Sequence, residues 1–129
     1  MLDTYYRFRP RLLIKSFSYA FAGLHHAIVH NQNMRIHITV AFLVMLASIF
    51  FRVNAFEMGI LGVMILLVLS AEMINTAIEE MVDLITKEHR QEAKIAKDVS
   101  AGMVLVTGGG SVIVGFLIFL PHILRLFFK

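Results

Sequence analysis

Three apolar segments, each about as long as a bilayer is thick, constrain this chain more than any other feature. They cover most of residues 36–51, 55–85 and 99–128. At about 1.5 Å per helical residue, each is long enough to cross a hydrocarbon core of roughly 30 Å. A soluble domain of 129 residues with 58% hydrophobic side chains could not bury that much apolar surface. We therefore expect an all-α integral membrane protein with spans at about residues 34–53, 55–85 and 97–126.

The segment before the first span has an amphipathic pattern. Within about residues 9–32, apolar side chains recur at helical spacing at Leu13, Phe17, Phe21 and Leu24. This spacing predicts a helix that lies on the membrane surface. A plain surface anchor with no further role is the simpler interpretation. We expect the whole chain, residues 1–129, to form one domain.

The basic residues predict the orientation of the spans. One side would hold Arg7, Arg9, Arg11, Lys15, Arg35, Lys87, Arg90, Lys94 and Lys97, and the other Arg52, Arg125 and Lys129. Because Lys and Arg are enriched in cytoplasmic loops, nine against three places the N-terminus and a polar loop over residues 86–96 in the cytoplasm.

A stripe of polar side chains follows the second apolar segment. On a helix, Glu72, Asn75, Glu79 and Asp83 fall within about 80° of one another, whereas Glu80 lies off this stripe. Carboxylates beside lipid are costly, so we expect the stripe to face protein, a cation or water. Its position at the cytoplasmic end of the span would let it meet soluble substrates.

The types of residue in the stripe suit phosphoryl transfer. Glu72 and Glu79 are about 10 Å apart along a helix axis, which favours two separate roles over one shared ion. One carboxylate could ligate the metal of a nucleotide while the other accepts a proton from a hydroxyl, with Asn75 orienting either group. Lys97 and Asp98 add a cation for phosphate and a further acid.

Two other interpretations of the stripe remain open on chemistry alone. Its acids could form inter-helix pairs with Lys97 or Arg35, or they could line a proton or ion pathway. Other sites are disfavoured: the histidines lack zincin spacing, and the chain contains no cysteine to ligate a metal. The run Gly108–Ser111 lacks the lysine of a phosphate loop, so we expect it to serve close helix packing.

Four sequence blocks resemble one family, the small prokaryotic membrane kinases that comprise diacylglycerol kinase and undecaprenol kinase. The first two are Glu72-x-x-Asn75-Thr76-Ala77-Ile78-Glu79-x-x-x-Asp83 and Ala96-Lys97-Asp98 followed by Ser100-Ala101-Gly102. The other two are Ala22-Gly23-Leu24 and Asn33-Met34-Arg35-Ile36-His37. Together they extend the resemblance over nearly the whole chain.

The resemblance implies a homotrimer in the bacterial inner membrane, with composite active sites between subunits at the cytoplasmic surface. It implies phosphorylation of a lipid hydroxyl by ATP with Mg²⁺, and no nucleic-acid partner. Glu72 would be the catalytic base, supported by Asn75, and Glu79 would ligate the metal. The nucleotide would contact Lys97, Asp98, Tyr19 and the loop residues Glu88, His89 and Arg90.

One departure from the family pattern concerns the metal. Asn31 stands where a second metal-binding Glu is expected, so metal binding should be weaker unless Asp83, Asp98 or water substitutes. The blocks after Asp83 and Lys97 look closer to undecaprenol kinase, which favours a polyprenol acceptor. Diacylglycerol is the alternative acceptor, and a non-catalytic membrane subunit or ion carrier is the alternative from another class.

Overall fold

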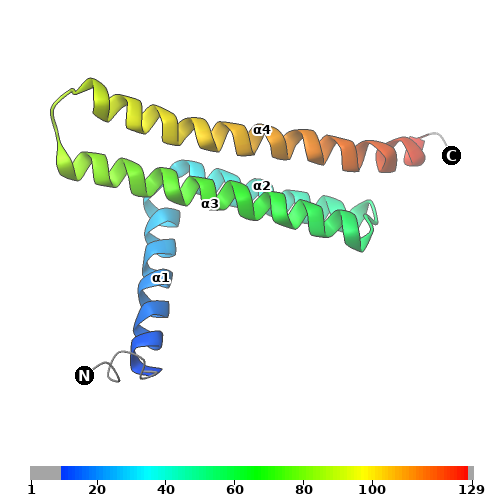
Figure 1. Cartoon of the computed structure of the whole chain (residues 1–129). Coiled ribbons are helices and arrows are strands. Elements are labelled where there is room, and N and C mark those ends of the chain that lie inside the picture. The colour runs from blue at the N-terminus through cyan, green and yellow to red at the C-terminus, as the bar shows by residue number, and fades with distance from the viewer. Residues whose placement is uncertain (1–9, 128–129) are drawn as a thin grey trace, which may run out of the picture.

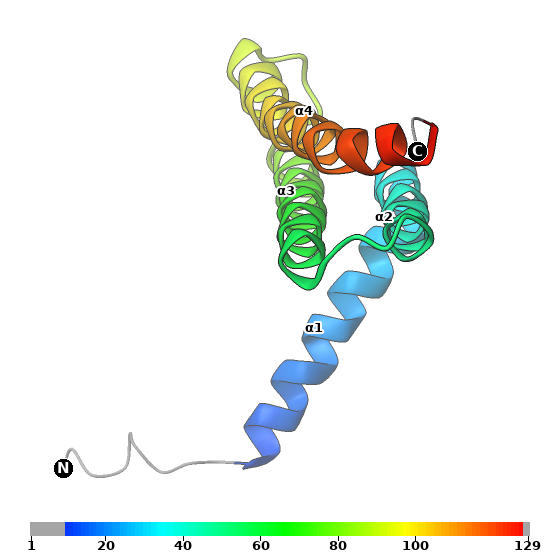
Figure 2. The ribbon, with the colours of Figure 1, turned by 90° about the vertical axis from the view of Figure 1, so that its right-hand side faces the viewer.

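A computed structural model describes residues 10–127, which form four α-helices joined by short turns (Figure 1). The helices are α1 (Pro10–His30), α2 (Gln32–Phe50), α3 (Ala55–Ile85) and α4 (Gln91–Phe127). In both views α2, α3 and α4 run side by side, and α1 projects away from one end of this bundle (Figures 1 and 2). The expected all-α class is confirmed.

The helix boundaries follow from local capping chemistry. Helix α1 begins at Pro10, whose fixed φ and missing N–H suit a first helical position. Asn31, in an extended conformation, separates α1 from α2 and caps α2 with its side chain. At the start of α3, Asn54 and Glu57 form a capping box, in which each side chain binds the other's backbone N–H.

The helices differ in length, and this difference places the polar residues. Helix α2 has 19 residues and is about 28 Å long, whereas α3 and α4 have 31 and 37 residues and are about 46 and 55 Å long. The end of α3 and the start of α4 extend together past the start of α2 (Figure 1). They thereby carry the turn between them past the start of α2.

The turn between α3 and α4 is shorter than the sequence suggested. We expected a polar loop over residues 86–96, but α4 begins at Gln91, so only residues 86–90 are non-helical. The polar residues after Gln91 are good helix formers, and Glu92 in the first turn interacts favourably with the helix dipole. Composition therefore suggested a loop where the chain continues the helix outside the membrane.

All four helices are long and apolar enough to cross a membrane, including α1, which we expected to lie on its surface. The mean hydropathy of the α1 segment is 1.2, the lowest of the four, against 1.7, 2.0 and 2.3 for α2, α3 and α4. Length and composition therefore do not show whether α1 crosses the membrane or lies on its surface. The expected start of the surface helix at residue 9, and the basic residues Arg7 and Arg9, lie outside the described residues.

Few side chains are buried in the bundle. A small cluster of Val53, Leu61 and Ile118 joins the three helices near the α2–α3 turn, whereas most large apolar side chains are exposed, as lipid-facing residues would be. The expected close packing through Gly108–Ser111 is not found within this chain. A methyl group added at Gly110 would meet only the Met64 Cε at 3.9 Å, and at Gly108 or Gly109 it would meet nothing within 4 Å. Those two glycines line an open groove instead.

Candidate active site

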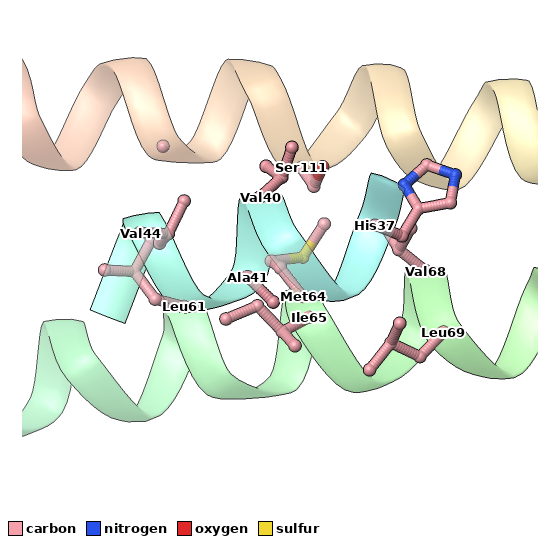
Figure 3. A pocket seen from close by; sticks show the side chains of 11 residues that line it. His37, Val40, Ala41, Val44, Leu61, Met64, Ile65, Val68, Leu69 and Ser111 are labelled. Atoms are coloured by element: carbon pink, nitrogen blue, oxygen red, sulfur yellow. The ribbon is translucent and has the colours of Figure 1, made fainter. Parts of the chain in front are cut away.

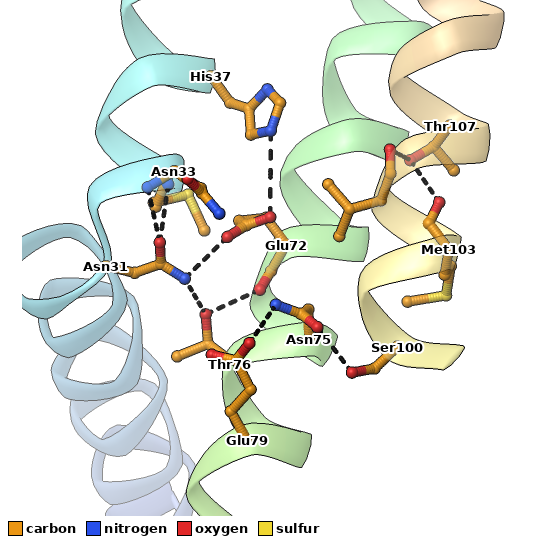
Figure 4. A network of polar contacts seen from close by, with 12 residues as sticks. Asn31, Asn33, His37, Glu72, Asn75, Thr76, Glu79, Ser100, Met103 and Thr107 are labelled. Atoms are coloured by element: carbon orange, nitrogen blue, oxygen red, sulfur yellow. Dashed lines mark hydrogen bonds and ion pairs between the residues drawn. The ribbon is translucent and has the colours of Figure 1, made fainter. Parts of the chain in front are cut away.

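The centre of the candidate site is Glu72, a carboxylate buried completely where α3 passes the junction of α1 and α2. The side-chain amide of Asn31 donates to Glu72 Oε1 at 2.8 Å and to Thr76 Oγ1 at 2.7 Å. Thr76 in turn donates to the backbone carbonyl of Glu72 at 2.9 Å. These bonds, drawn in Figure 4, tie the α1–α2 junction to α3 and fix the orientation of the Glu72 carboxylate.

Asn31 presents a donor, not an oxygen, to this carboxylate. Its Oδ1 accepts the backbone N–H groups of Asn33 and Met34 at 2.8 and 3.2 Å, because these first amides of α2 have no partner within the helix. The amide nitrogen must then point toward α3. In this arrangement the oxygen that we expected as a weak metal ligand is already engaged in capping α2.

The second oxygen of Glu72 is unoccupied. Oε2 is buried and has no hydrogen-bond partner among the described residues, and the ring nitrogen Nε2 of His37 lies 4.0 Å from it. A buried acceptor without a partner is costly, and in native proteins such a group is explained by a catalytic role, by strain, or by a bound water or ion. We expected His37 to cap or pair at the membrane interface and not to be a site residue, although it closes one of the four family-like blocks.

A second set of contacts continues from Glu72 toward α4. Asn75, also buried, donates to Glu79 Oε1 at 3.2 Å and accepts from the Ser100 hydroxyl at 2.7 Å (Figure 4). The expected supporting role of Asn75 therefore has a geometric basis, because its amide links both helices. Ser100, which we had not singled out as a site residue, orients Asn75.

These carboxylates fit a metal only together with other ligands. Within residues 10–127, no three His, Asp or Glu side chains converge on one point. Glu72 and Glu79 lie about 10 Å apart along the α3 axis, so either could supply one carboxylate, and Mg²⁺ in kinases is commonly held by one or two carboxylates plus phosphate oxygens and water. The donor set therefore suits an ion that arrives with a nucleotide.

A separate basic hollow of about 500 Å³ opens beside the α3–α4 turn. It gathers five of the residues that we expected around the nucleotide, Glu88, His89, Arg90, Lys97 and Asp98, but not Tyr19 or Glu79. Asp83, expected as metal support, and two lysines that we did not assign, Lys87 and Lys94, also line it. Lys87 and Lys94 were missed because they were counted only as orienting charges. For Lys94 the sequence did contain a signal: Lys94 and Lys97 are spaced i, i+3, which places both on one face of a helix.

Ion pairs order the hollow. Lys97 Nζ lies 2.6 Å from Asp83 Oδ1 and joins α4 to α3, and Arg90 lies 2.9 Å from Glu88 within the turn. Asp83, one turn after Glu79 on α3, thus has Lys97 as its ion-pair partner. All four side chains are at least one-third exposed, so a bound phosphate can compete for their charges.

Tyr19 does not reach this hollow within one chain. It lies on α1 with 72% of its surface exposed, and α1 meets the bundle only at its far end, where His26 lies 3.6 Å from Glu80 (Figure 2). Glu80 is therefore an inter-helix residue, as its position off the stripe suggested.

An apolar groove borders Glu72. It measures about 480 Å³, runs between α2 and α4, and has Glu72 and Asn75 at its base. His37 also borders a smaller cavity of about 80 Å³ that Val44, Leu61, Met64 and other apolar side chains enclose (Figure 3). A hydrophobic ligand could therefore reach the carboxylate without passing through water.

Comparison with known proteins identifies the family of this chain. The profile of the prokaryotic diacylglycerol kinase family matches residues 18–119. The chain belongs to this family. Its assignment as a lipid kinase is therefore confirmed, and a non-catalytic role is not supported.

Relatives with curated functions include both kinds of lipid kinase. A diacylglycerol kinase from Synechocystis sp. is 39% identical over 118 residues, which cover 91% of this chain and 67% of that protein. An undecaprenol kinase from Bacillus subtilis is 38% identical over 109 residues, covering 84% and 89%. A diacylglycerol kinase from Escherichia coli K12 is 29% identical over 94 residues, covering 73% and 77%. Similarity alone leaves the acceptor lipid open.

Proposed function

We propose that this chain transfers the γ-phosphoryl group of ATP to the hydroxyl of a membrane polyprenol, most specifically undecaprenol. The observation that carries the proposal is the free, buried oxygen of Glu72 at the base of an apolar groove. The groove suits a long isoprenoid chain, and the Bacillus undecaprenol kinase is matched over 89% of its length. Diacylglycerol is the alternative acceptor, favoured by the similar identity of the Synechocystis enzyme.

In this proposal Glu72 acts as general base. The lipid hydroxyl transfers its proton to Oε2, its oxygen forms a bond to the γ-phosphorus, and the bond from that phosphorus to the bridging oxygen of ADP breaks. The donation from Asn31 holds the other oxygen, Oε1, in place. The free oxygen therefore stays directed at the substrate while it accepts the proton.

Glu79 would hold the Mg²⁺ ion of the nucleotide. Asn75 donates to one of its oxygens and so orients the carboxylate. A magnesium ion bound to ATP supplies positive charge to the phosphates. Asn31 is committed to capping α2, so water would complete the ion's ligands on that side.

The basic hollow would hold the triphosphate, with Lys97 and Lys94 on α4 and Arg90 in the turn as phosphate contacts. Asp98, Glu88 and His89 line the same hollow and would contact the nucleoside. Tyr19 would reach the adenine of a neighbouring copy, because it is remote from the hollow of its own chain. This arrangement requires an oligomer, which we propose to be a homotrimer.

The membrane placement follows the charge distribution. We propose that α2, α3 and α4 cross the inner membrane and that α1 lies on its cytoplasmic surface, since α1 is the least apolar helix and runs across the bundle direction (Figure 1). The hollow and Glu72 would then face cytoplasmic ATP.

A competition assay tests the acceptor. Purified protein in bilayers would receive labelled ATP with equal mole fractions of undecaprenol and diacylglycerol, and the labelled lipids would be separated. We expect phosphorylated undecaprenol to predominate and labelling to require Mg²⁺. Predominant labelling of diacylglycerol would reject the polyprenol assignment while leaving the kinase reaction intact.

A further inference from the structure

Another hollow lies at the opposite end of the bundle, and the candidate active site makes no use of it. It measures about 430 Å³ and is lined by Phe50, Phe51, Arg52, His122, Arg125 and Leu126, which we call the arginine cup. From Ala55, beside the cup, to Glu72 is about 26 Å along α3. The cup and the candidate base are thus separated by nearly the thickness of a hydrocarbon core of about 30 Å.

The two arginines of the cup have no acidic partner among the described residues. Glu57 is the only acidic residue between residues 4 and 71 or after residue 98. Its Oε2 accepts the Asn54 backbone N–H at 3.2 Å and lies 3.5 Å from His122 Nε2. Within residues 10–127, neither Arg52 nor Arg125 forms a salt bridge.

Arg52 occupies a backbone position that favours glycine. Its φ is +54°, and the N–H of Val53 bonds to the Ser48 carbonyl at 2.9 Å while that of Arg52 bonds to Ile49 at 3.1 Å. This is the Schellman pattern, whose left-handed residue is usually glycine because it has no Cβ. An arginine at this left-handed position is locally unfavourable, which suggests that its side chain has a function.

We propose that the arginine cup binds the phosphate of an anionic phospholipid. Two guanidinium groups suit phosphate oxygens because their N–H groups can bind in pairs. Apolar side chains adjoin them, and Phe50 and Leu126 are 73% and 60% exposed, so acyl chains can lie against the same wall. A headgroup site with this apolar border suits a lipid better than a free phosphate.

The absence of tryptophan from the chain permits a local test. Phe50→Trp places one fluorophore in the cup, and the full-length protein is reconstituted with brominated phosphatidylglycerol or brominated phosphatidylcholine, which quench only on contact. Since each basic residue near an anionic headgroup strengthens binding about five-fold, we expect at least five-fold tighter quenching by the anionic lipid. Equal quenching by the two lipids would overturn the proposal.

Variants separate the cup from general surface charge. In the Phe50→Trp background, Arg52→Gly and Arg125→Gln should each reduce the preference several-fold, and Arg52→Gly should melt no lower because glycine suits that φ. Lys15→Gln, which removes one charge from exposed α1, should leave the preference unchanged. Moving the reporter from the cup to the exposed Phe116 on α4 should abolish the preference, because quenching reports only lipid in contact with the tryptophan. An equal loss in Lys15→Gln would assign the preference to net charge. Relief of quenching by soluble glycerol phosphate would show a site that needs no acyl chains and would also contradict the proposal.

Discussion

At the scale of single residues, the free oxygen of Glu72 gives the sharpest prediction. Glu72→Gln retains an oxygen that can accept from Asn31, so the fold and the nucleotide hollow should be preserved. The variant cannot take a proton, and we expect kcat to fall by about 10² to 10⁴-fold. Steady-state assays at saturating lipid, together with equilibrium ATP binding, measure the two effects separately.

Glu80→Gln is the matched control for that variant. Glu80 lies two turns further along α3 and is exposed, with only His26 nearby, so its substitution should leave kcat near the wild-type value. Near-normal turnover of Glu72→Gln would show that another group accepts the proton.

At the scale of helices, Asn31 determines how α1, α2 and α3 join. Asn31→Ala removes the cap of α2, worth about 1 kcal/mol, and leaves Glu72 Oε1 buried without its donor, at about 1 to 3 kcal/mol. We therefore expect the free energy of unfolding to fall by about 2 to 4 kcal/mol. Denaturant or thermal unfolding in a fixed detergent measures the loss.

Asn31→Ser divides this effect into its two parts. Serine can cap α2, but its shorter side chain does not extend to Glu72, so only the second part should be lost. If Asn31→Ala unfolds like the wild type, the junction is held by other contacts and the carboxylate is not oriented by Asn31.

At the scale of the whole molecule, the separation of Tyr19 from the basic hollow predicts contact between chains. The chain contains no cysteine, so Tyr19→Cys and His89→Cys each introduce a single thiol. When the two variants are mixed and treated with a short bismaleimide, we expect heterodimers on a denaturing gel. A chain carrying both substitutions should give covalent species of up to three copies.

Two results would contradict that arrangement. Either variant alone should give little dimer, because like positions in a closed trimer are not expected to meet at this site. If the double variant closes only within one chain, α1 folds back onto its own hollow. A covalent ladder beyond three copies would reject the trimer.

The sequence by itself determined the helices, their membrane character and the residues of the acidic stripe. These features depend on local properties: segment length, hydropathy and a repeat of 3.6 residues, each of which a single helix displays before it packs. The resemblance of four short blocks to one family was confirmed by the family match. Each block lies within a few helical turns, so it too is a local feature that the sequence displays. The start of α4 was misplaced because polar composition is shared by loops and by helices outside a membrane.

Only the tertiary structure decided what each polar atom of the site does. Asn31 and Glu72 are 41 residues apart, and Ser100 and Asn75 are 25 apart, so no sequence pattern predicts their contacts. In the fold Asn31, which we expected as a weak metal ligand, caps α2 and donates to Glu72. The fold also paired Asp83 with Lys97 and left one oxygen of Glu72 free. Hydrogen bonds depend on atoms meeting within about 3 Å, and such meetings between distant helices are fixed by packing.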